Sequence, residues 1–315
     1  MILESEVNAI LTKQVLSEER GVAASKYGKV CEEIVDYCNS VISTTPKMSV
    51  EFNGVAYDYR ITVPSELTEK IDFIEDLDLK IYLKPVKDPS FTGGGLTTFK
   101  RSIHFTGRGT HDKLEPLTVV VYGDYCSTGV VRRTVLNSLY HEINHCYDAW
   151  SRKDPRFGSK LMNDIVNGNK DASRVFSHDQ YANAYFNTLF YRIFIPTELN
   201  AMCSGVYGDL RGFNASRENF REDIKRTQAG FLLKFLADNF DAAVGQASIQ
   251  TLMDTCLAMD IDGISMKDQR TFLVTFKGVV EKMIRHAWKS VGRAASLWYD
   301  HKEDAEKEKM EDISI

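Results

Sequence analysis

The chain has 315 residues, of which 43% are hydrophobic and 26% charged. This composition excludes a disordered chain and supplies enough apolar surface for one large domain or two moderate ones. The formal net charge of −5 gives no broad basic field and argues against nucleic acid or an anionic membrane as the main partner. Residues 2–6 (ILESE) lack the basic and apolar segments of a secretion signal, and the six cysteines form no CxxC pair. We therefore expect reduced thiols and an intracellular protein, in the cytoplasm or, if phage-encoded, in the host cytoplasm or a virion.

The first half of the chain predicts a helix, then strands, then a second helix. Residues 24–44 carry apolar side chains at helical spacing. Runs rich in β-branched and aromatic residues, separated by Pro, Gly and Asp, predict strands at 50–63, 77–83, 102–105 and 117–122. A helix capped by Ser127 or Thr128 is predicted from about 130 to about 152. The pattern indicates an α+β fold, with a twisted, mostly antiparallel sheet packed on this second helix.

The second helix contains His141-Glu142-Ile143-Asn144-His145, which matches the pattern HExxH. Residues four apart on an α-helix lie on one face, so both imidazoles can reach one metal ion. The two histidines share a polar stripe with Thr134, Asn137, Ser138 and Asp148. Apolar residues occupy the opposite side, which is typical of a helix that buries its back in a core and faces a cleft. The alternative is a pair of solvated histidines on an ordinary amphipathic helix.

A catalytic zinc site needs three protein ligands and an open position for water. The metzincin continuation of the motif would require Gly at position 148 and His at position 151, but the chain has Asp148 and Ser151. The segment 195–201 (IPTELNA) resembles instead the second-helix glutamate of gluzincins, in which a small residue commonly follows three positions after the ligand. The chain thus resembles the zincin metallopeptidases, in particular their gluzincin branch, over about residues 117–209.

The second half of this resemblance concerns a helix predicted at about 197–209. Pro196 and Thr197 mark its start and place Glu198 in the first turn, where a carboxylate is favoured by the helix dipole. Glu198 shares a helical face with Ala201, Met202 and Gly205. Because two of these four residues are small, we expect this helix to approach the HExxH helix closely.

The resemblance implies a set of roles for individual residues. His141, His145 and Glu198 would bind Zn²⁺, and Glu142 would activate a water molecule. More than fifty residues separate His145 from Glu198, a longer gap than in the thermolysin type, so His178 and Asp148 remain alternative third ligands. His178, Tyr181 or Tyr185 could supply a donor that stabilises an oxyanion. Zincins also bind an extended peptide along an edge strand, for which the candidates here are 102–105 and 117–122.

Beyond residue 212 the apolar residues keep helical spacing as far as Trp298, and the segment 301–315 is rich in charged residues. Three stripes stand out, and the first two include Phe231 and Leu257. We therefore predict a zincin-like catalytic domain over 1–212, a helical subdomain over 213–300 that closes one side of the cleft, and a charged tail over 301–315.

The functional hypothesis is a zinc-dependent metallopeptidase that acts on a peptide or protein. A structural or interaction protein is the alternative, for example a phage particle component that keeps a zincin-like fold and docks through its C-terminal helices. A zinc hydrolase with a substrate other than a peptide is a third interpretation. The spacing of motifs does not encode the substrate, because specificity depends on the shapes of pockets.

Overall fold

The computed structural model describes residues 18–52, 54–73, 77–86, 94–106, 109–151, 180–213, 215–259 and 261–313. The chain packs into two compact units, each discontinuous in sequence. One unit comprises residues 17–155, 201–228 and 293–315, and the other comprises 1–16, 156–200 and 229–292. Two of the boundaries fall inside the helices α7 (Pro196–Gly212) and α12 (Gln269–Ile313), so each of these helices contributes to both units. The predicted division at residue 212 stays a prediction.

The first unit contains the β-structure and has the expected α+β class. Helix α2 (Glu18–Thr44) precedes an antiparallel pair of short strands, β1 (Val50–Phe52) and β2 (Val55–Tyr57). A five-stranded sheet follows in the order β3-β4-β6-β5, with β7 paired to β6. Its strands are β3 (Tyr59–Thr62), β4 (Asp78–Pro85), β5 (Gly94–Thr106), β6 (Gly109–Cys126) and β7 (Gly129–Val130), and the short helix α3 (Ser65–Thr68) lies between β3 and β4 in sequence. The sheet is mixed, because β4 and β6 are parallel while its other pairings are antiparallel.

Strands β5 and β6 form a hairpin in which β5 pairs with β6 along its whole length. Residues 118–125 of β6 also pair with β4 on the other side. The candidate edge strand at 117–122 is therefore interior from residue 118 onward. Among the described strands, β5 has a neighbour on one side only, which leaves the candidate at 102–105 as the edge segment.

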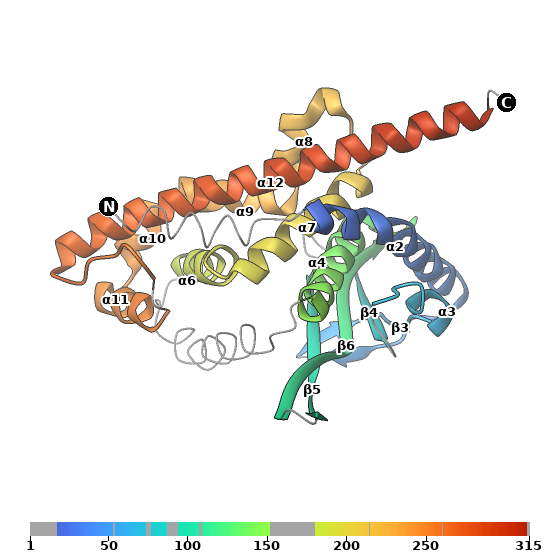
Figure 1. Cartoon of the computed structure of the whole chain (residues 1–315), viewed down its shortest axis with the longest axis horizontal. Helices are drawn as coiled ribbons and strands as arrows, with labels where there is room; N and C mark the ends of the chain where they lie inside the picture. Colours follow the sequence, from blue (N-terminus) through green and yellow to red (C-terminus); the bar gives the residue numbers. More distant parts are fainter. Residues whose placement is uncertain are drawn as a thin grey trace. The chain divides into compact units, whose positions relative to one another are not determined.

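Helix α4 (Arg132–Ser151) carries the HExxH motif and packs on β5 and β6 (Figure 1). Its apolar back is buried, as predicted; the buried side chains include Val135, Leu136, Leu139, Tyr140, Ile143 and Cys146. The predicted cap was wrong. Ser127 and Thr128 form the turn between β6 and β7, and Gly129 adopts a φ of +117° that favours glycine. This small hairpin delays the start of the helix to Arg132.

The second unit is helical. It contains α6 (Gln180–Thr188), a π-helical turn η1 (Leu189–Ile193), the first turn of α7, α10 (Phe240–Gln246), α11 (Ile249–Ala258), most of α9 (Gln228–Asp238) and the first half of α12. Aromatic rings fill its core, and the stacked pairs include Phe186 with Phe190 and Phe272 with Phe276. The helical character predicted beyond residue 212 is confirmed, and α8 (Phe220–Arg226), after the 3-10 turn η2 (Arg217–Asn219), belongs to the first unit. Among the described helices, none combines the length and apolar character needed to cross a bilayer.

Candidate metal centre

The candidate site depends on how closely α7 approaches α4. A Cβ atom on Gly208 would lie 2.5 Å from backbone atoms of Leu136 and Asn137, and one on Gly212 would lie 2.6 Å from the Cα of Arg133. Real Cβ atoms do not approach backbone so closely, so only glycine permits this packing. The later residue of α7 contacts the earlier residue of α4, which makes the two helices antiparallel.

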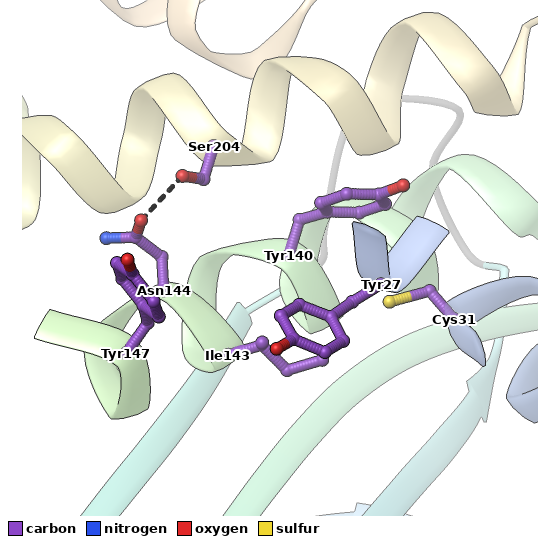
Figure 2. A pocket seen from close by; sticks show the side chains of 7 residues that line it. All are labelled: Tyr27, Cys31, Tyr140, Ile143, Asn144, Tyr147 and Ser204. Carbon is purple, nitrogen blue, oxygen red and sulfur yellow. Dashed lines mark hydrogen bonds between the residues drawn. The ribbon is translucent and has the colours of Figure 1, made fainter. Parts of the chain in front are cut away.

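Buried hydrogen bonds fix the register of the two helices. Asn137 donates from Nδ2 to the carbonyl of Gly205 and to Oδ2 of Asp209, both at 2.9 Å. The hydroxyl of Ser204 donates to Oδ1 of Asn144, the residue directly before His145, at 2.8 Å (Figure 2). Breaking such a bond would leave a polar atom buried without a partner, at a cost of about 1–3 kcal/mol. The close approach expected from the small Gly205 is confirmed, since its Cβ position lies 2.8 Å from Nδ2 of Asn137.

Three side chains that could hold a metal ion form one group, His141, His145 and Glu198. The Nε2 atoms of His141 and His145 are 3.2 Å apart. Two imidazoles on a tetrahedral zinc, with Zn–N bonds of about 2.0–2.1 Å, have nitrogens about 3.3 Å apart. The ligand atoms of His141, His145 and Glu198 all lie within 4.8 Å of one another. The structure thus brings together the three residues that the sequence assigned to a metal.

The distance between the histidines also suits a hydrogen bond from a protonated to an unprotonated Nε2. The group also contains a carboxylate, which a hydrogen-bonded pair of histidines does not require. Glu198 is only 5% exposed, and burying a charged carboxylate is unfavourable unless cations or donors surround it. A carboxylate beside two half-buried imidazoles provides the oxygen and nitrogen donors that zinc accepts.

Two further charged residues adjoin this group: Glu142 is next to His141 in sequence, and Arg192 contacts Glu198. Glu142, which follows His141 in the motif, is 3% exposed. Arg192 donates from Nη1 to Oε2 of Glu198 at 2.6 Å. The imidazoles retain partial solvent access, which a hydrolytic site needs so that water can enter.

The other predicted site residues fall elsewhere or outside the described residues. Tyr185 is fully buried and donates its one hydroxyl proton to the carbonyl of Leu236 at 3.1 Å, so that proton is not available to an oxyanion. The predicted role of Tyr185 stays a prediction. His178 lies outside the described residues, and the side chains of Tyr181 and Asp148 are not described either, so their roles stay predictions.

A small cavity of about 20 Å³ lies behind α4, and Figure 2 shows the residues that line it. Tyr27 and Cys31 of α2 form one wall, and Tyr140 and Ile143 contribute from the apolar back of α4. A cavity of this volume holds about one water molecule. It is therefore a packing gap behind the HExxH helix and not a substrate pocket.

Sequence reasoning assigned no role to Arg192 or Asn144. Asn144 occupies one of the two unspecified positions of HExxH, so the motif attaches no meaning to it. Arg192 lies six residues before Glu198, and a cation at that distance is not part of any helical pattern. The only available signal was the position of a charged residue among aromatic ones just before the start of α7.

No family model matches the sequence, and no match was found among curated proteins or solved structures. The interpretation of the site therefore depends on the residues of this chain and their geometry.

Proposed function

We propose that this protein is a zinc-dependent metallopeptidase of the gluzincin type. The observation that carries the proposal is the convergence of His141, His145 and Glu198, with ligand atoms within 4.8 Å of one another. Two histidines and a glutamate form one of the ligand sets of catalytic zinc, which keeps a fourth position for water.

The residues around this group suit hydrolysis. Bound zinc would act as a Lewis acid and lower the pKa of a water molecule toward about 7. Glu142 would accept the proton of the attacking water and pass it to the leaving amine. Glu142 suits this role because it directly follows His141 in the motif and its side chain is buried.

The sheet supports a peptide as the substrate. Strand β5 lies at the edge of the described sheet and packs beside α4. An extended peptide could add to this edge through backbone hydrogen bonds and present a carbonyl to the metal. This arrangement resembles that of zincins.

The test compares wild type with Glu142→Gln, which keeps the size of the side chain and removes its basicity. We expect both proteins to bind one zinc ion and the variant to hydrolyse peptides slower by a factor of about 10²–10⁴. Zinc is measured by elemental analysis, and cleavage by mass spectrometry of a peptide library. His145→Ala serves as the control that should lose the metal.

A wild type without zinc, or full activity in Glu142→Gln, would refute the proposal. A wild type that binds zinc, cleaves no peptide and elutes from gel filtration as a multimer would favour the structural or interaction role instead.

A further inference from the structure

The strongest unassigned feature near the proposed metal site is the ion pair between Arg192 and Glu198. Its Nη1–Oε2 distance of 2.6 Å is at the short end for a charge-assisted hydrogen bond. The Glu198 side chain is 7% exposed and that of Arg192 is 34% exposed. A carboxylate so far removed from water requires a partner, and the guanidinium provides one.

The backbone around Arg192 has a defined conformation with buried neighbours. It lies in the π-helical turn η1, a rare geometry that is frequent at functional sites. Leu189, Phe190 and Ile193 of the same turn are buried, and the amide of Phe194 bonds to the carbonyl of Leu189 at 3.1 Å. The ion pair thus spans the corner between η1 and the first turn of α7, with one end anchored in an apolar core.

We propose that Arg192 is a positioning residue that holds Glu198 ready to bind the metal. The proposal rests on the metal site proposed above. A carboxylate has two oxygens, and the hydrogen bond from Arg192 to Oε2 fixes the direction in which the group points. Partners of this kind fix the direction of a ligand before the metal arrives, so less conformational freedom is lost on binding.

Electrostatic repulsion opposes this role of Arg192, because a guanidinium repels a divalent cation. Arg192 is one-third exposed, so water and salt screen its charge toward the metal. Glu198 is nearly excluded from water, so without Arg192 its carboxylate would lose a buried partner and would turn toward solvent. We therefore expect loss of orientation to outweigh relief of repulsion.

The experiment measures zinc affinity by competition with a chromophoric chelator. We expect Arg192→Met to bind zinc about 10–100-fold more weakly than wild type. Arg192→Lys should fall between the two, because lysine keeps the charge without the planar donor group. Arg285→Met is the matched control and should bind as wild type does, since Arg285 is exposed and pairs only loosely with Glu281, at 3.9 Å.

A second readout separates positioning from general stability. Cobalt replaces zinc, and its visible spectrum reports the coordination geometry. The spectrum of Arg192→Met should lose intensity as the glutamate ligand is displaced, whereas that of Arg285→Met should not change.

Zinc affinity of Arg192→Met equal to or tighter than wild type, with an unchanged cobalt spectrum, would overturn this inference while leaving the metallopeptidase proposal in place. A wild type that binds neither metal would overturn both. If Arg192→Met does not fold, Arg192→Lys decides the question, and wild-type affinity in that variant would count against positioning.

Discussion

Asp209 is the residue at which burial and charge oppose each other most strongly. It is fully buried on α7 and accepts hydrogen bonds from the amide of Gln228 at 2.7 Å and from Asn137 at 2.9 Å. Arg133 adds an ion pair at 3.4 Å. These partners lower the pKa of Asp209, but desolvation by burial outweighs them and raises the pKa to about 7 from its ordinary value of 3.8.

This shift predicts a pH dependence of stability that Asp209→Asn should remove. Between about pH 4 and pH 7 the folded protein keeps a proton on Asp209 that the unfolded chain has released, so stability falls as pH rises through this window. Above pH 7 this loss of stability is complete and is on the order of a few kcal/mol. The measurement is urea unfolding of wild type and variant from pH 4 to pH 8.

The difference between the two unfolding free energies isolates Asp209, because the other titrating groups are common to both proteins. As pH rises, the unfolding free energy of Asp209→Asn should increase relative to that of wild type. A difference that is constant over the whole range would contradict the shifted pKa.

At the scale of elements, the packing of α7 on α4 depends on glycine. We expect Gly208→Ala to destabilise the protein by about 2 kcal/mol or more, because the added Cβ meets backbone at 2.5 Å and the helices must separate. Separation would also move Glu198 away from the histidines and weaken zinc binding. Thermal unfolding and chelator competition measure the two effects.

Gly278→Ala is the control for this substitution. Gly278 lies in α12 with nothing within 4 Å of its Cβ position, so alanine should stabilise the helix by about 0.5–1 kcal/mol through its higher propensity. If Gly208→Ala is as stable in thermal unfolding as Gly278→Ala, α7 and α4 are not in the close contact that the proposed site requires.

The sequence predicted the positions of α4 and α7 better than it predicted the start of α4 or the burial of apolar residues in later helices. The polar stripe of α4 and the Pro196 start of α7 are local signals, and both helices lie where expected. The start of α4 was misplaced because Ser127 and Thr128 suit a helix cap as well as a tight turn. Phe231 and Leu257 lie in helical stripes yet are 62% and 60% exposed, because periodicity cannot tell whether a neighbour covers a given position.

At the scale of the whole molecule, the division into units was beyond sequence reasoning. Helices α7 and α12 continue across the boundaries at residues 200 and 292, so the hydrophobic period does not break there. Arg192 was missed for a related reason, since a π-helical turn has no recognised sequence pattern. The sequence therefore identified the candidate ligands, whereas the contacts of Arg192 with Glu198 and of Asn144 with Ser204 became visible only in the structure.

The proposed metal site predicts a stability effect for the entire chain. In the unfolded chain more than fifty residues separate His145 from Glu198, so zinc should bind the folded state preferentially. Zinc at about 100 times its dissociation constant should then stabilise the fold by about 2.7 kcal/mol. Urea unfolding in excess zinc and in EDTA measures the difference. His145→Ala should show none, and neither should wild type in Mg²⁺, which prefers oxygen ligands. Equal stabilisation of His145→Ala by zinc would mean that the ion binds elsewhere on the protein, and would remove His145 from the site.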